Sequence, residues 1–253
     1  MKLLIHPAYA SHKKDIVGIL NDFDHSGTPL GKGERNQIKL FDYRGQTLNV
    51  KSFKIPNPIN KIVYKYFRKS KAQRSFENAM YLLEHGMGTP QPIAYAENFY
   101  LFGLKDSYYA SAHIDYDLTF RELITNPKYP EREIIIKHFT KFTFLLHENN
   151  ILFKDHSPGN TLIKKVNGQY RFYLVDLNRM EFKKLSYNER IKNFARLTPK
   201  MDMVKAISEA YASLIKKDKD DVFRLMWQMT EDFQEKYHRK RKLKKKYIFW
   251  RKK

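Results

Sequence analysis

Residues 145–178 constrain the possible folds of this chain more than any other segment. They include LLHENNILFKDHSPGNTLI at 145–163 and FYLVDLN at 172–178. Two short apolar runs flank an Asn-Gly turn at 166–169, a pattern that predicts a β-hairpin. Asp155 and Asn160 precede this hairpin and Asp176 follows it. The segment therefore predicts polar side chains at fixed points around two short strands.

Asp155, Asn160 and Asp176 are the residue types that phosphoryl transfer requires. A carboxylate can accept the proton of an attacking hydroxyl, and oxygen ligands can hold magnesium against phosphates. An asparagine offers a neutral carbonyl oxygen, and an aspartate at the end of an apolar strand offers a charge at a rigid point. On converging loops, these three residues would form a magnesium site.

The N-terminal part predicts a small antiparallel sheet with helices. Residues 38–54 alternate apolar and polar around Tyr-Arg-Gly-Gln, which predicts a hairpin. Residues 94–116 predict two further strands with a turn at 103–107. Apolar spacing predicts a helix from Ile59 and a second one from Ser70 to Gly86.

The chain beyond Asp117 is predicted to be mostly helical. The clearest helix covers residues 131–149, and everything from about Tyr187 has a helical and charged pattern. The junction between the lobes is predicted at 114–118. The predicted parts are an N-terminal lobe at 1–116, a C-terminal lobe at 117–238 and a basic, aromatic tail at 239–253.

The segment around Asp155 resembles the catalytic loop of the protein-kinase-like superfamily, and VDLN resembles its metal-binding aspartate motif. The resemblance implies an α+β, bilobal, protein-kinase-like fold, with a small antiparallel-sheet N-lobe and a mostly helical C-lobe. It implies ATP and Mg²⁺ as cofactors, Asp155 as catalytic base, and Asn160 and Asp176 as metal ligands. Phe153 stands where protein kinases usually have histidine, and Asn178 replaces their glycine. These departures favour the saccharide and small-molecule branch.

The same resemblance assigns nucleotide-binding roles in the N-lobe. Gly31 and Gly33, in the loop SGTPLGKGERNQIK, would lie against the phosphates, although glycines in a loop are a weak signal on their own. Lys51 would contact the α- and β-phosphates, and Lys54 is its main competitor for that role. Glu77, on the second predicted helix, would pair with Lys51.

Two histidines flank the predicted loop. His147 ends the helix before the loop, and a structural role is the favoured interpretation over a catalytic one. His156 directly follows Asp155. It could bind an acceptor oxygen or phosphate, or face solvent, so it stays outside the predicted catalytic set.

Residues 25–180 are also similar to the lipopolysaccharide core kinases, which act on Kdo or heptose of the inner core. The likeness lies in VKSFK at 50–54, the basic helix at 60–79, TPQPIAY at 89–95 and FKDHSPGN at 153–160. It implies transfer from ATP to a sugar hydroxyl of a lipid-linked anionic saccharide at the inner face of the cytoplasmic membrane. Two alternatives stay open: an atypical protein or small-molecule kinase of the same fold, and a non-catalytic kinase-like binding protein. GTP as donor also stays open.

The charge distribution indicates an anionic partner. The formal net charge is +21, from 48 Lys and Arg against 27 Asp and Glu. Ten of the fifteen residues at 239–253 are basic, with Tyr, Ile, Phe and Trp between them. This tail could lie on an anionic bilayer, contact RNA, remain solvated or form a packed final helix; the membrane is the favoured partner and nucleic acid is unlikely.

Two absences exclude other classes of protein. The chain has no cysteine, which excludes disulfides, thiolate zinc sites and cysteine nucleophiles. No apolar run reaches the ~20 residues of a membrane span, and the start of the chain does not match a secretory signal. The chain is therefore expected to be cytoplasmic, with possible peripheral contact with the membrane.

Overall fold

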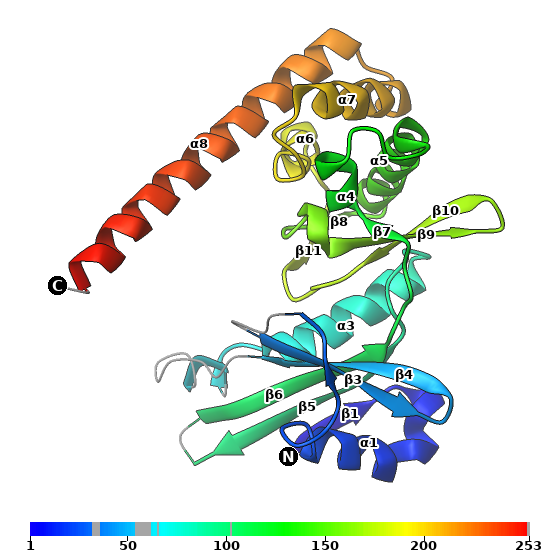
Figure 1. The fold of residues 1–253 in the computed structure, drawn as a ribbon, viewed down its shortest axis with the longest axis vertical. Helices are drawn as coiled ribbons and strands as arrows, with labels where there is room; N and C mark the ends of the chain where they lie inside the picture. Colours follow the sequence, from blue (N-terminus) through cyan, green and yellow to red (C-terminus); the bar gives the residue numbers. More distant parts are fainter. Residues whose placement is uncertain (32–35, 54–61, 65, 102, 252–253) are drawn as a thin grey trace. The chain divides into compact units, whose positions relative to one another are not determined.

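The computed structural model describes residues 1–31, 36–53, 62–64, 66–101 and 103–251, and only the backbone of 245–251. The chain divides into two compact units (Figure 1). Unit 1 comprises Met1–Asp115 and Tyr173–Arg179, and unit 2 comprises Tyr116–Phe172 and Met180–Lys253. The predicted division at 116 placed 173–179 with the second lobe, whereas the structure groups this segment with unit 1.

Unit 1 contains a six-stranded sheet in the order β1-β5-β6-β4-β3-β2, in which neighbouring strands are antiparallel. Its strands are β1 (Lys2–Ile5), β2 (Thr28–Pro29), β3 (Asn36–Tyr43), β4 (Gln46–Phe53), β5 (Pro92–Tyr100) and β6 (Gly103–Ala112). The helices whose bounds are described in this unit are η1 (Pro7–His12), α1 (Lys13–Asn21) and α3 (Lys71–Glu84). The predicted small antiparallel sheet is confirmed.

The hairpin β3–β4 is the best-predicted element of unit 1. Arg44 and Gly45 both have positive φ, 48° and 75°, as a two-residue turn of the type I′ class requires. Alternate residues of the two strands, such as Leu48 and Val50, are buried against Ile16 of α1. The apolar alternation in the sequence therefore corresponds to one buried face of the sheet.

Helix α3 begins and ends close to the predicted positions. The Ser70 side chain accepts a hydrogen bond from the Gln73 backbone N–H at the first turn, and Gly86 follows the helix with φ 69°. Phe76 packs against Tyr95 of β5, with ring centroids 5.5 Å apart. In the other predicted helix, from Ile59, residues 59–61 and 65 lie outside the described residues, and residues 62–64 and 66 are helical.

Two features of unit 1 differ from the predictions. The elements β1 and α1 were not predicted, although β1 pairs with β5 along its whole length. The turn predicted at 103–107 was wrong, because Gly103 already begins β6 and pairs with Tyr100.

Unit 2 contains most of the helices. They are α4 (Phe120–Thr125), α5 (Arg132–Glu148), η2 (Pro158–Asn160), α6 (Tyr187–Asn193), α7 (Met201–Ile215) and α8 (Lys219–Arg251). Short strands form the sheets β10-β9-β7 and β11-β8. They are β7 (Leu118–Thr119), β8 (Ile151–Phe153), β9 (Thr161–Val166), β10 (Gln169–Leu174) and β11 (Met180–Phe182). The predicted helix at 131–149 and the hairpin around the Asn-Gly turn are confirmed.

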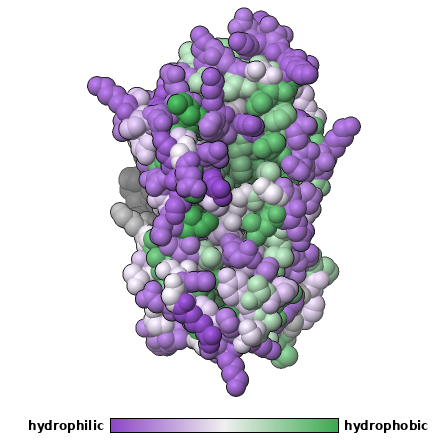
Figure 2. Space-filling view, turned by 90° about the vertical axis from the view of Figure 1, so that its right-hand side faces the viewer, coloured by the Kyte–Doolittle hydropathy of each residue, from purple (hydrophilic) through white to green (hydrophobic). Residues whose placement is uncertain are grey.

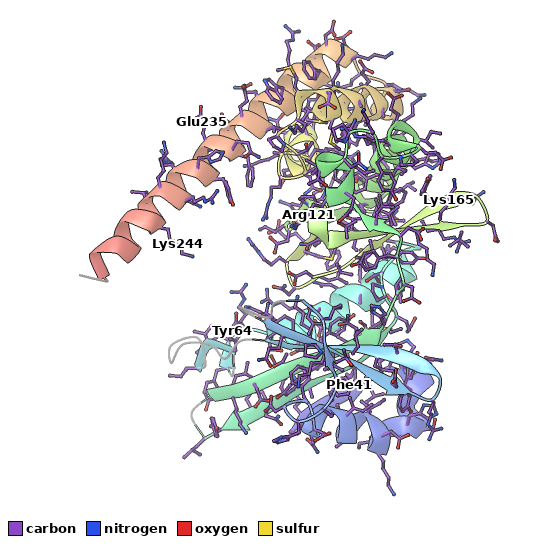
Figure 3. The ribbon with its side chains drawn as sticks, in the orientation of Figure 1. Phe41, Tyr64, Arg121, Lys165, Glu235 and Lys244 are labelled. Atoms are coloured by element: carbon purple, nitrogen blue, oxygen red, sulfur yellow. The ribbon has the colours of Figure 1, made fainter. Side chains whose placement is uncertain are left out.

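Helix α8 belongs to the core of unit 2 only in its first half. Val222, Met226 and Thr230 are buried at a spacing of four residues, one face of a helix. In contrast, every residue from 235 to 244 is exposed. Figure 3 shows Glu235 and Lys244 on this part of the helix, which extends beyond α6 and α7. The predicted tail at 239–253 is therefore, in its described part, a continuation of α8.

On the face shown in Figure 2, hydrophilic residues predominate and hydrophobic residues form patches among them. Within the described ranges, none of the helices combines the length and apolar character needed to cross a membrane.

Candidate functional site

Lys51 and Asp176 form an ion pair in unit 1. The distance between Lys51 Nζ and Asp176 Oδ1 is 2.7 Å, and the lysine side chain is only 13% exposed. The ammonium also lies 5.4 Å from the centroid of the Phe53 ring. Because a poorly solvated ammonium is costly without a partner, the aspartate stabilises this lysine on β4.

The segment Tyr173–Arg179 is fixed to unit 1 by two hydrogen bonds from side chains. Asn78 of α3 donates from Nδ2 to the Leu177 carbonyl at 2.6 Å. The Thr89 hydroxyl donates to the Leu174 carbonyl at 2.8 Å. These bonds hold the backbone on both sides of Asp176. Sequence reasoning missed Asn78 and Thr89, since neither stands in a recognisable motif.

Asp176 has an unusual backbone conformation. Its φ is 61°, in the left-handed region that few non-glycine residues occupy. Asn178 Nδ2 donates to Asp176 Oδ1 at 2.8 Å, the same oxygen that Lys51 contacts. Asn178, which stands at the position of the glycine in the predicted metal motif, thus orients the carboxylate.

The structure does not contain the predicted ion pair between Lys51 and Glu77. Glu77 instead accepts hydrogen bonds from Lys69 Nζ at 2.8 Å and from Gln73 Nε2 at 2.9 Å. Lys51 pairs with Asp176. The prediction was wrong because local donors on and beside α3 satisfy both Glu77 oxygens, while Asp176 supplies the charge that Lys51 needs.

Gly31 lies after β2, at the start of the loop that leads to β3. Its φ of 81° favours glycine, and the preceding Leu30 N–H donates to the Ile38 carbonyl at 2.8 Å. Gly33 and the competing Lys54 lie outside the described residues. The predicted phosphate-binding role of Gly31 and Gly33 stays a prediction.

Asp155 and Asn160 come together in unit 2, in the loop between β8 and β9. The Asp155 carbonyl accepts from the Ser157 N–H at 2.7 Å and from Asn160 Nδ2 at 2.8 Å. Since this second bond uses the amide nitrogen of Asn160, its carbonyl oxygen Oδ1 is the atom suited to a metal. The five-residue spacing thus closes the loop on itself.

Arg196 contacts the same loop and was missed from the sequence. Its Nη1 donates both to Asp155 Oδ1 and to the Lys154 carbonyl, each at 2.8 Å. The guanidinium also lies 5.7 Å from the Phe233 ring centroid. A single arginine in a charged helical region carries no signal in the sequence, whereas the structure shows that it fixes the Asp155 carboxylate.

A buried chain of hydrogen bonds supports the Asp155 loop through the preceding strand, β8. Asn193 donates from Nδ2 to the Phe153 carbonyl at 2.8 Å, and its Oδ1 lies 3.2 Å from His147 Nε2. His147 Nδ1 lies 2.8 Å from the Tyr211 hydroxyl. Because Asn193 Oδ1 can only accept, Nε2 carries the proton, so Nδ1 accepts from Tyr211. The favoured structural role of His147 is confirmed.

His156 is fully buried and does not face solvent. Its ring lies among the rings of Phe139, Phe153 and Phe194, with centroids 5.3, 5.8 and 6.3 Å away. Burial lowers the pKa of His156 to about 3 and that of His147 to about 4. Both histidines are therefore neutral at neutral pH, and they pack the base of the Asp155 loop.

These two pKa values predict acid-induced loss of stability. An unfolded histidine has a pKa of about 6.5, so below that pH the unfolded chain binds protons that the folded chain does not. The contribution of the two neutral histidines to the free energy of unfolding is complete above pH 6.5. It is lost as the pH falls toward 4. Between pH 7 and 5 the free energy of unfolding should fall by about 2 kcal/mol per histidine, measured by urea denaturation.

The matched test uses His156→Phe and, as control, His138→Phe at an exposed position on α5. The first variant should show a shallower dependence of stability on pH, and the control should follow the wild type. Equal slopes for His156→Phe and the wild type would contradict this assignment.

The predicted role of Asn160 and Asp176 as magnesium ligands stays a prediction. Within the described ranges, no three His, Asp or Glu side chains form a metal-binding group. Mg²⁺ typically takes one or two protein ligands and completes its shell with water and substrate phosphates. Taken separately, Asp176, whose Oδ1 accepts both of the bonds above, and Asn160, whose amide nitrogen is already bonded, each carry an oxygen of the type that Mg²⁺ takes.

The comparisons with known proteins identify the fold. No protein-family model matches the chain, and no curated protein sequence does. The solved structure of WaaP in complex with acyl carrier protein matches with a TM-score of 0.65, covering 93% of this chain and 99% of that one at 13% identity. An acyl carrier protein was not among the predicted partners. The predicted fold class is confirmed: this chain shares the kinase-like fold of WaaP, with an antiparallel sheet in its N-terminal part and mostly helices in its C-terminal part.

Proposed function

We propose that this protein is an ATP- and Mg²⁺-dependent kinase that phosphorylates a sugar hydroxyl of the lipopolysaccharide inner core, on Kdo or heptose. The observation that carries the proposal is the Lys51–Asp176 ion pair, found in a chain with the fold of WaaP. A strand lysine beside the aspartate of a metal motif is the arrangement that binds nucleotide phosphates and their metal in kinases.

In this proposal Lys51 and the loop at Gly31 bind the phosphates. Asp176 and Asn160 would hold magnesium, which neutralises charge on the phosphates when it is bound. Lys51 would then exchange its contact with Asp176 for contacts with phosphate oxygens. The left-handed backbone of Asp176, held by Asn78 and Thr89 through its neighbours, keeps that carboxylate in a defined position.

Asp155 would accept the proton of the attacking sugar hydroxyl. Arg196 and the closed loop around Asn160 fix the position of this carboxylate and its backbone. Since phosphoryl transfer depends mainly on positioning and charge stabilisation, no covalent enzyme intermediate is expected.

The test is transfer of labelled phosphate from ATP, and separately from GTP, to a lipopolysaccharide core acceptor with and without Mg²⁺. Magnesium-dependent incorporation into the saccharide supports the proposal. Incorporation only into proteins or small metabolites would favour another kinase of the same fold. Absence of nucleotide binding would favour the non-catalytic alternative.

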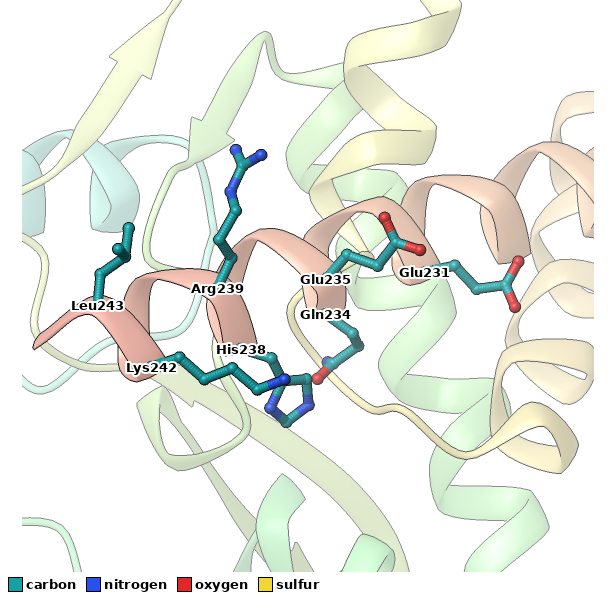
Figure 4. A pocket seen from close by; sticks show the side chains of 7 residues that line it. All are labelled: Glu231, Gln234, Glu235, His238, Arg239, Lys242 and Leu243. Atoms are coloured by element: carbon teal, nitrogen blue, oxygen red, sulfur yellow. The ribbon is translucent and has the colours of Figure 1, made fainter. Parts of the chain in front are cut away.

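The exposed half of α8 supports contact with an anionic membrane. Residues 235–244 carry six Lys or Arg side chains and one Glu. Figure 4 shows the face formed by Glu231, Gln234, Glu235, His238, Arg239, Lys242 and Leu243, all of them from α8. A face lined by a single helix encloses no ligand, so we assign it to a surface contact and not to a binding pocket.

Neutralising this helix should weaken binding to anionic vesicles. Each basic residue near an anionic bilayer contributes about 1 kcal/mol. Replacing Lys240, Lys242 and Lys244 with glutamine should therefore reduce binding to phosphatidylglycerol vesicles roughly 100-fold in a sedimentation assay.

The matched control replaces three exposed lysines of unit 2 that lie outside the exposed half of α8, Lys205, Lys216 and Lys219, with glutamine. This variant loses the same charge and should bind vesicles much more tightly than the α8 variant. Equal loss in both variants would show that only net charge matters. Salt-dependent binding to RNA without binding to vesicles would favour a nucleic-acid partner.

A further inference from the structure

A pocket of about 500 Å³ lies beside Arg196, entirely within unit 2. Its walls come from β8, β11, α6, the residues that follow α6, and the middle of α8. This volume is in the range of pockets that bind small molecules. The roles proposed above for the nucleotide and for magnesium do not involve it.

Arg196 connects this pocket to the Asp155 loop. The arginine lines the pocket and also donates to Asp155 Oδ1 and to the Lys154 carbonyl. Lys154 itself lines the pocket as well. Arg196 therefore contacts both the pocket and the Asp155 carboxylate that is proposed as the base.

The walls combine an apolar surface with both donors and acceptors of hydrogen bonds. Leu152, Met229 and Phe233 supply apolar surface, and Glu181, Glu189 and Asp232 supply carboxylates. A sugar presents C–H groups on its ring faces and hydroxyls around its edge, so it needs this mixture of contacts. A purely apolar ligand would leave the carboxylates desolvated without partners.

Cationic side chains outnumber carboxylates in the pocket, four (Lys154, Lys192, Arg196 and Lys236) against three (Glu181, Glu189 and Asp232), which favours an acidic ligand. Lys192 of α6 and Lys236 of α8 both line it, and within the described ranges neither makes a salt bridge. Lys154, in contrast, is neutralised by Glu181. The two lysines therefore remain to bind a carboxylate of the ligand, in addition to the contacts of its hydroxyls.

We propose that this pocket is the acceptor subsite and that it binds a carboxylate-bearing sugar through Lys192 and Lys236. The inference rests on the proposed kinase function, which it narrows from a core sugar in general to an acidic one such as Kdo. Arg196 then has two roles, as a wall of the acceptor subsite and as a positioning residue for Asp155.

The first experiment measures sugar binding without nucleotide, by NMR titration of the full chain with free Kdo and with its uncharged methyl ester. The wild type should bind Kdo at least tenfold more tightly than the ester. The double variant Lys192→Ala/Lys236→Ala should lose this preference and bind Kdo at least tenfold more weakly. Lys205→Ala/Lys219→Ala, changed at exposed positions outside the pocket, should behave as the wild type.

The second experiment separates this inference from the kinase proposal. In the transfer assay, the pocket variant should raise KM for the acceptor at least tenfold and leave KM for ATP unchanged. Transfer with an unchanged acceptor KM, or wild-type protein that binds Mg-ATP but shows no preference for Kdo over its ester, would overturn the subsite. Kdo binding that depends on the two lysines without any transfer would keep the subsite and refute the kinase function.

Discussion

Replacing Asp155 with asparagine is expected to lower turnover by about 10²–10⁴-fold, the contribution typical of a general base. The side chain keeps its shape, and Arg196 and Asn160 can retain their contacts with the loop. What is lost is the negative charge that accepts the proton of the sugar hydroxyl. Nucleotide affinity should not change, because Lys51, Asp176 and the Gly31 loop belong to unit 1.

The measurement for Asp155→Asn is kcat for phosphate transfer, together with a nucleotide-binding isotherm. Asp202→Asn is the matched control, since Asp202 is an exposed aspartate of the same unit that also pairs with an arginine, Arg132. It should retain wild-type kcat. An Asp155→Asn protein with unchanged turnover would refute the role of Asp155 as base.

Replacing Asp176 with asparagine is expected to abolish the effect of magnesium on nucleotide binding and to lower turnover by about 10³-fold. A metal ion contributes several kcal/mol of charge stabilisation in such reactions, and each 1.4 kcal/mol changes the rate tenfold. The asparagine keeps an oxygen for Asn178 but removes the charge that pairs with Lys51. Titration of nucleotide with and without Mg²⁺ measures the effect directly.

Removing the charge of Asp176 also leaves Lys51 unpaired, so stability needs its own control. Lys51→Met/Asp176→Asn removes both charges and should recover the stability that the single aspartate variant loses. It should not recover turnover. If the single variant kept full magnesium dependence, the assignment of Asp176 as a metal ligand would be wrong.

The local elements were predictable because their signals are local. The hairpin β3–β4 has an alternating pattern around an Arg-Gly turn with positive φ, and α3 has a capping serine and a terminal glycine. Strand β1 has only four residues and depends on pairing with β5, which lies about 90 residues further along the chain. A strand so short is defined by its partner and not by its own composition.

The site was predictable as a set of residue types but not as a set of contacts. The spacing of Asp155 and Asn160 correctly brought them into one loop. The predicted partner of Lys51 was wrong for two reasons. Its actual partner, Asp176, lies 125 positions further along the chain, and Glu77 is already bonded to a donor close to it in the sequence. Arg196 and Asn193 act through backbone carbonyls of the loop, and such contacts leave no pattern in the sequence.

Unit 1 consists of two segments that are far apart in the sequence, and this sets an order for its folding during synthesis. Residues 1–115 form nearly all of this unit, yet they lack Tyr173–Arg179, which emerge from the ribosome only after most of the first half of unit 2 has been made. Until then Lys51 lacks the carboxylate of Asp176, and Asn78 and Thr89 lack the carbonyls to which they donate. An N-terminal fragment that ends at residue 115 would leave these three requirements unmet, so unit 1 is better produced with residues 173–179 in the same chain.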